Sequence, residues 1–231
     1  TDPCDTSLSV SVTATDSAGK TAKAQSKTTI SKTWCSYKAT NPVDPHGLVS
    51  NLVIALTQDV DGAIWVGTTD GLSRFSDGNW TTFLVADGLV SNDILSLWAH
   101  PKERELWIGT NEGAQRYQYP LVGDKSYTLF DTNNGLLGTT ASSENSNVVR
   151  CFSPVQNGDM LIGTDKGVYQ ISLGDDNPIK KNSALANFEV VAIASTPDRS
   201  VQWLATPTGP YVNLQNLGAL QWIDGTQWND G

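Results

Sequence analysis

Polar side chains recur at one place in several related segments of the chain, immediately before a glycine. In the first segment, residues 64–72, Asp70 precedes Gly71, and the matching residues of the next two segments are Asn111, Glu112, Asp165 and Lys166. Carboxylates, amides and ammonium groups can hydrogen-bond a polar ligand or a charged partner. A solvated turn is the alternative for each, because Asp and Asn are common turn residues.

Few residues suit catalysis. The chain has two histidines, His46 and His100, which is too few for a histidine-based metal site. It has no Gly-x-Ser-x-Gly elbow, no Walker loop and no carboxylate pair that can be placed at general acid–base distance. We therefore expect no enzyme activity, no catalytic residue and no metal. Asp59 with Asp61, or residues 175–177, could hold Ca²⁺ through carboxylate oxygens, but turn chemistry explains them more simply.

The same segments carry a recurring tryptophan, at Trp65, Trp107 and Trp203, whereas the third segment has Leu161. A row of tryptophans could stack on sugars. A large flat side chain that fills the wedge between adjacent sheets is the better explanation.

The glycines and threonines of the segments are also expected to be structural. The glycine two residues after the tryptophan permits close backbone approach, the next one serves a turn with positive φ, and the threonine between them satisfies turn donors. These residues are Gly67, Gly109 and Gly163; Gly71, Gly113, Gly167 and Gly209; and Thr68, Thr110, Thr164 and Thr206. For Arg74 and Arg116, which occupy equivalent places, we expect pairing with a neighbouring carboxylate.

Short strands must position all of these residues. The first unit predicts strands over 52–57, 64–67, 72–75 and 80–84, separated by Asp-Gly turns. Trp65 and Trp107 are 42 residues apart, and a period near 42 with four strands is typical of a propeller blade. We predict an all-β fold with about four four-stranded blades. Their expected ranges are 44–88, 89–136, 137–185 and 186–231, with a polar insertion near 138–146.

Blade geometry places the turns between second and third strands on the same face as the blade-to-blade connections. Residues 47–51 recur as 88–92, so these connections carry Ser50, Asn51, Ser91 and Asn92. We expect a ligand or partner on this face, at Asp70, Asn111, Glu112, Asp165, Lys166, Asn51 and Asn92, because propeller function usually lies on loops held by a rigid frame.

An N-terminal segment, residues 1–40, precedes the repeats at 41–231. Alternating residues and a turn at 16–20 predict a β-hairpin. Cys4 and Cys35 bracket it almost symmetrically, which predicts a disulfide and hence an oxidising, exported setting. Cys151 lies in an apolar run and is expected to be a buried, inert thiol.

Charge and hydropathy exclude some partners. The net charge is −9, with +1 on residues 1–47 and −10 on the remainder. An acidic body argues against nucleic acid as a partner. No run of about 18 apolar residues occurs, so no membrane span is expected.

Two resemblances follow from these motifs. Asp61-Gly62, Trp65-Val66-Gly67-Thr68, Gly71-Leu72 and Arg74-Phe75, followed by residues 88–92, resemble the two-component regulator propeller repeat, which builds exported bacterial sensor regions. The resemblance spans about 44–230, with departures at Leu161 and Ala205. Four repeats imply an incomplete ring, a compact four-bladed propeller, or a ring finished by another copy. Residues 12–22 resemble the closing hairpin of bacterial immunoglobulin-like repeats, whose earlier strands are absent here.

Three functional hypotheses remain open, and the one with the least support in the residues is an enzyme on a propeller scaffold. The first is an exported, non-enzymatic recognition module that binds a small ligand or a protein. The alternative is a structural or adhesive subunit of a surface assembly, such as a filament, that assembles through the exposed strand edges of residues 1–40.

Overall fold

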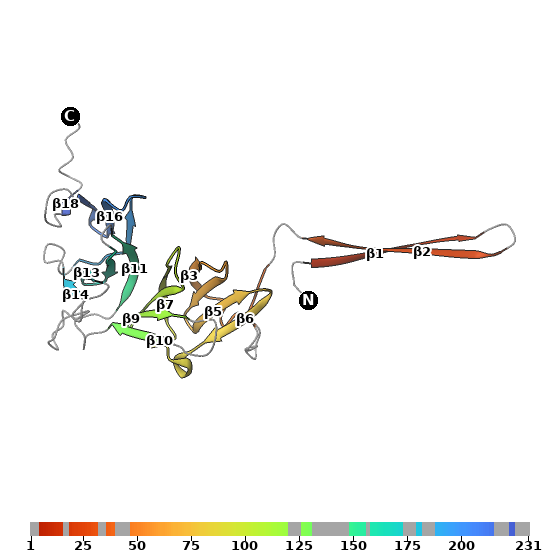
Figure 1. Cartoon of the computed structure of the whole chain (residues 1–231), viewed down its shortest axis with the longest axis horizontal. Coiled ribbons are helices and arrows are strands. Elements are labelled where there is room, and N and C mark those ends of the chain that lie inside the picture. The colour runs from red at the N-terminus through yellow and green to blue at the C-terminus, as the bar shows by residue number, and fades with distance from the viewer. Residues whose placement is uncertain are drawn as a thin grey trace, which may run out of the picture.

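Four antiparallel sheets of four strands each follow one another along the chain in the computed structural model (Figure 1). The structure describes residues 5–15, 19–31, 36–39, 47–119, 126–130, 148–155, 158–172, 179–181, 188–214 and 222–224. Within each sheet, every strand pairs with the next one along the chain. The predicted all-β fold of four four-stranded propeller blades is confirmed.

The strands of these sheets are short, and a 3₁₀ turn, η1 (Val85–Asp87), lies between the first two sheets. The first sheet contains β3 (Val53–Gln58), β4 (Ile64–Thr68), β5 (Gly71–Ser76) and β6 (Asn79–Phe83). The second contains β7 (Ile94–Ala99), β8 (Glu105–Thr110), β9 (Gly113–Gln118) and β10 (Ser126–Phe130). The third contains β11 (Val149–Pro154), β12 (Met160–Thr164), β13 (Gly167–Ile171) and β14 (Ile179–Lys181). The fourth contains β15 (Ala192–Ser195), β16 (Val201–Thr206), β17 (Gly209–Leu214) and β18 (Trp222–Asp224).

The first sheet agrees with the strands expected for the first unit, which differ from β3 to β6 by at most one residue at each end. Each sheet falls inside one of the four expected blade ranges, while the exact domain limits stay a prediction. The expected insertion at 138–146 lies outside the described residues.

Apolar clusters hold successive sheets together. Each sheet has a Trp face, which carries Trp65, Trp107, Leu161 or Trp203, and a back face, which carries Val53, Ile94, Val149 or Leu204. The Trp face of one sheet packs on the back face of the next: Trp65 against Ile94 and Ile108, Trp107 against Val149 and Ile162, and Leu161 against Leu204. The wedge role is confirmed for Trp65 and Trp107, which are 1% and 0% exposed.

Glycine is required at these junctions because the backbones approach closely. A Cβ on Gly67 would lie 2.6 Å from Ile94 Cγ2, and one on Gly109 would lie 2.8 Å from the Val149 carbonyl oxygen. Both distances are shorter than a carbon atom tolerates, which confirms the predicted close approach.

The row of sheets has two outer faces, at opposite ends (Figure 1). At one end, Leu56 on the back face of the first sheet is 64% exposed. The Tyr37 ring covers the outer part of this face, with its centroid 5.1 Å from that of the Phe75 ring. At the other end, Trp203 is 43% exposed, because no fifth sheet follows the fourth among the described residues. The wedge predicted for Trp203 is therefore not formed here.

The N-terminal hairpin extends away from the four sheets (Figure 1). It consists of β1 (Asp5–Thr15) and β2 (Thr21–Ser31), which form a two-stranded antiparallel sheet with Thr15 opposite Thr21. The predicted hairpin and its turn position are thus confirmed. Cys4 and Cys35 lie outside the described residues, so their disulfide stays a prediction, as does the immunoglobulin-like interpretation.

Candidate functional site

The predicted site residues lie on turns between the second and third strands and on the connections between sheets. In the second sheet these two places meet, because Ser91 Oγ donates a hydrogen bond to Asn111 Oδ1 at 2.8 Å. The structure therefore brings these turns and connections to one edge, as the blade geometry predicts.

A threonine closes each of these turns. In all four sheets its Oγ1 donates to the carbonyl oxygen of the following glycine, at 2.8–2.9 Å. The same oxygen accepts the backbone N–H of the residue before that glycine, at 3.0–3.3 Å. The four glycines have φ between 123° and 142°. The predicted structural roles of threonine and glycine are confirmed.

The turn side chains differ in what they contact. Asp70 and Glu112 are exposed, and Lys166 is half-buried. Asn51 and Asn92 use Oδ1 to accept the backbone N–H groups of Ala39 and Val85, both at 2.8 Å. Asp165 Oδ1 is buried and has no hydrogen-bond partner among the described residues. Whether any of these residues contacts a ligand stays a prediction.

A cavity lies at the opposite edge of the sheets. It lies where the turns between the first and second strands of the second, third and fourth sheets meet. It has a volume of about 350 Å³. Its lining is formed by Trp98, His100, Glu103, Glu105, Arg116, Pro154, Gly158, Met160 and Arg199. We call it the three-sheet cavity. None of its residues belongs to the predicted site.

A neutralised ion pair occupies part of the cavity lining. Glu105 is 3% exposed and accepts hydrogen bonds from Trp107 Nε1 at 2.8 Å and from Arg116 Nε at 2.7 Å. Arg74 likewise lies 3.6 Å from the buried Asp59 carboxylate in the first sheet. The pairing expected for Arg74 and Arg116 is confirmed, and it stabilises the orientation of the wedge tryptophans.

The second sheet also supplies an aromatic wall. Trp98 and His100 meet edge to face, with ring centroids 5.7 Å apart. His100 Nδ1 accepts the backbone N–H of Lys102 at 3.3 Å, which places the proton of a neutral ring on Nε2. The wall therefore offers an apolar surface and one N–H donor.

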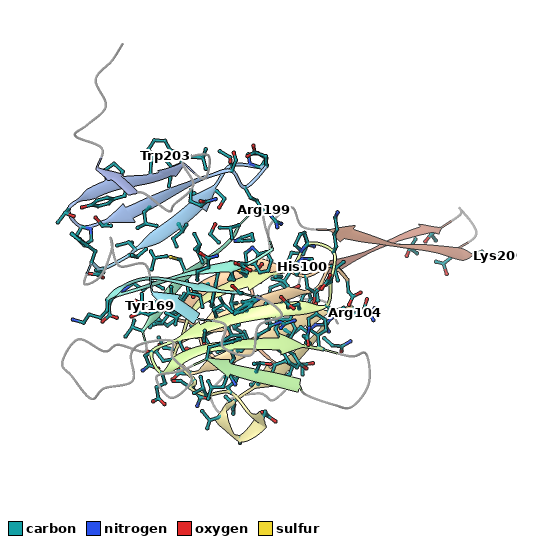
Figure 2. All side chains as sticks on the ribbon, turned by 60° about the vertical axis from the view of Figure 1, so that its left-hand side comes forward. Lys20, His100, Arg104, Tyr169, Arg199 and Trp203 are labelled. Atoms are coloured by element: carbon teal, nitrogen blue, oxygen red, sulfur yellow. The ribbon has the colours of Figure 1, made fainter. Side chains whose placement is uncertain are left out.

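The fourth sheet contributes Arg199 from its first turn. Figure 2 labels Arg199 and His100, which come from different sheets and line the same cavity. Asp198 holds this turn, because its carboxylate accepts Thr196 Oγ1 at 2.5 Å and Ser200 Oγ at 2.8 Å. These hydrogen bonds keep the pKa of Asp198 below its usual value.

The carboxylates considered for Ca²⁺ are occupied by protein donors. Asp59 accepts Trp65 Nε1 at 2.8 Å and the backbone N–H of Ala63 at 2.9 Å, and Asp61 pairs with Arg104 at 2.9 Å. In the described part of the chain, no three His, Cys, Asp or Glu residues are grouped as metal ligands. Residues 175–177 lie outside it.

Cys151 is the free thiol of the described residues. Burial raises its pKa to about 12, so it stays protonated at neutral pH. This agrees with the inert thiol expected from the sequence.

Comparisons with known proteins agree with this fold. The two component regulator propeller family model matches residues 47–70, which include β3 and β4. No curated protein matches the chain. None of the described residues forms a helix long and apolar enough to cross a membrane.

Several solved structures are similar to the chain. One is the extracellular domain of a hybrid two-component system from B. thetaiotaomicron, with 17% identity and a TM-score of 0.60 over 90% of this chain and 28% of that one. A second such domain from B. thetaiotaomicron has 22% identity and a TM-score of 0.60 over 80% of this chain and 24% of that one. PorZ, a surface component of the type IX secretion system of Porphyromonas gingivalis, has 15% identity and a TM-score of 0.57 over 87% of this chain and 30% of its own. The chain spans less than a third of each of these structures, and the similarity establishes the shared fold.

One signal in the sequence could have located the cavity. The first turns of the first and third sheets end in Gly62 and Gly158, whereas the fourth has Arg199 at the corresponding place. An arginine where related turns use glycine is a reason to examine that turn. Trp98 and Glu105 carry no comparable signal, because only the packing of sheets brings them together.

Proposed function

We propose that the chain is the recognition part of an exported protein and that it binds a small polar ligand, without catalysis, in the three-sheet cavity. The observation that carries this proposal is the cavity of about 350 Å³ lined by residues of three successive sheets. Small-molecule sites in proteins are concave and combine apolar walls with a few polar groups, and they have volumes of about 300–1,000 Å³. Trp98 and Met160 supply apolar surface, while His100 and Arg199 supply donors.

Binding is favoured over catalysis by the chemistry of the lining. Glu105 and Arg116 are engaged with each other, so neither is a free acid or base. The His100 ring accepts a backbone N–H and has no carboxylate hydrogen-bonded to it among the described residues. A serine or cysteine nucleophile is missing from the described lining of the cavity.

Export is supported by the comparisons, and it agrees with a disulfide that the sequence predicts. Two of the similar structures are extracellular domains of two-component systems. The predicted Cys4–Cys35 disulfide would persist only in an oxidising compartment.

The surface-assembly alternative rests on the N-terminal hairpin. Two strands of 11 residues each extend from the sheets and leave two edges that a third strand could join (Figure 1). Deletion of residues 1–40 should abolish any assembly that uses these edges, and assembly that survives the deletion would contradict this alternative.

The test of the main proposal compares the two edges of the sheets. Saturation-transfer NMR with a panel of small polar molecules, which includes benzamide and benzoate, would be run on the parent chain, His100→Ala and Asp70→Ala. We expect at least one molecule to bind the parent and Asp70→Ala, and to bind His100→Ala at least several-fold more weakly. Loss of binding in Asp70→Ala alone would favour the turns predicted from the sequence, and no binding to the parent would overturn the proposal.

A further inference from the structure

In three of the four sheets, the turn between the first and second strands has the same hydrogen bond. One of these three turns differs from the other two in the type of its last residue. In each, the last turn residue donates its N–H to the carbonyl oxygen three residues earlier: Gly62 to Asp59, Gly158 to Val155 and Arg199 to Thr196. The φ angles of these donors are 86°, 91° and 60°, all in the left-handed region. Glycine adopts that region freely, whereas a side chain with a Cβ is strained there.

Arg199 is therefore strained at a position where two sister turns use glycine. Backbone strain of this kind persists where the surrounding structure enforces it, and it is concentrated at functional sites. The surrounding contacts are visible: Asp198 holds the turn through Thr196 and Ser200, and Gln202 Nε2 donates to the Arg199 carbonyl oxygen at 2.8 Å.

The guanidinium of Arg199 also has no carboxylate partner among the described residues. In the described part of the chain, the ion pairs join Arg74, Arg104, Arg116 and Arg150 to carboxylates, and none involves Arg199. Arg199 lines the three-sheet cavity, in which Arg116 is already neutralised by Glu105. Glu103, the other carboxylate of the lining, is exposed to solvent, where its charge is well screened.

From these observations, and given the proposed function of the cavity, we infer that Arg199 is the anion-binding residue and that the ligand is a small organic carboxylate. A planar guanidinium matches a carboxylate with two parallel hydrogen bonds. The body of the ligand would lie against the apolar wall of Trp98 and Met160, which also line the cavity.

The experiment uses benzoate and its neutral isostere benzamide as probes, and titrates each into the full chain by NMR. We expect benzoate to bind the parent chain at least tenfold more tightly than benzamide. Arg199→Gly should bind the two probes equally, and its melting temperature should equal or exceed that of the parent, because glycine relieves the left-handed strain. Glu103→Gln should bind benzoate slightly more tightly than the parent, since a like charge is removed.

The outcomes separate this inference from the proposed function. In one outcome, benzamide binds, His100→Ala weakens this binding, and benzoate binds no more tightly than benzamide. The cavity is then a binding site, but Arg199 does not bind an anion. If Arg199→Gly retains the tenfold preference for benzoate, the inference is also wrong. If inorganic phosphate displaces benzoate at equal concentration, the site binds anions in general and the assignment to carboxylates is wrong. Absence of binding by both probes and by the wider panel would overturn the proposed function and the inference together.

Discussion

The junctions between successive sheets and the two outer faces of the row are built from the same repeat, yet they differ in exposure. Trp107 is 0% exposed within the junction between the second and third sheets, while Trp203, at the matching place on the fourth sheet, is 43% exposed. The back face differs in the same way, since Ile94 is buried and Val53, at the matching place on the first sheet, is 41% exposed. The repeat thus supplies each sheet with two apolar faces, and burial depends on whether a neighbouring sheet covers them.

The largest expected difference in stability is between variants of the two tryptophans, Trp107 and Trp203. Trp107→Ala should lower the free energy of unfolding by about 3–5 kcal/mol, because it removes a buried ring and leaves the hydrogen bond of Glu105 unmade. Trp203→Ala should cost about 1 kcal/mol or less, because much of its side chain is already solvated. Urea unfolding of both variants measures the difference, and equal losses would contradict the comparison.

An intermediate loss of stability is expected when the glycine two residues after the tryptophan is replaced. Gly109→Ala should cost about 1–3 kcal/mol, because the new Cβ would meet the Val149 carbonyl oxygen, a backbone atom that cannot move aside. The matched change in the fourth sheet, Ala205→Gly, relieves no clash and should cost about 0.5–1 kcal/mol through backbone entropy. Thermal unfolding of the two variants checks these values. A Gly109→Ala variant as stable as the parent would show that the junction can adjust.

The smallest effect concerns the ion pair that joins the first turns of the first and second sheets. Arg104 donates to the Asp61 carboxylate and lowers its pKa below 3.8, the value without a partner. Because the folded-state pKa is lowered, the contribution of this pair is fully present above pH 3.8 and is lost as the pH falls through the lowered pKa. Both groups are exposed, so the contribution should be small and weakened by salt.

Asp61→Asn tests this pair, with Asp70→Asn as the matched exposed control. Urea midpoints of the parent and Asp61→Asn should differ at neutral pH and converge as the pH falls to about 2, whereas Asp70→Asn should follow the parent throughout. A difference that persists in acid would mean that Asp61 acts through its shape and not through its charge.

Local features of the chain were predictable because they depend on neighbours in sequence. The Asp-Gly turns, the period near 42 and the alternation in residues 5–34 indicated the strands, and the turn hydrogen bonds of Thr68 agree with the expected role of this threonine. The expectation that Arg116 pairs with a carboxylate was also met, although the sequence did not identify Glu105 as that carboxylate.

The three-sheet cavity was not predictable in the same way. Glu105, Gly158 and Arg199 come from three sheets and are separated along the chain by 53 and 41 residues. The turns between second and third strands, where the sequence predicted a site, lie at the other end of each strand. No pattern within a single repeat distinguishes the two edges, because each edge carries polar turns.

By itself, the sequence determined the repeat, its strands, its turn residues and its apolar faces, since these depend on contacts between residues close along the chain. Only the tertiary structure decided which apolar faces are covered, where the cavity lies and that Arg199 has a left-handed backbone without a carboxylate partner among the described residues. The physical reason is that a sheet acquires its burial and its ligand-sized hollows from the sheets beside it, and their placement is not written in any one repeat.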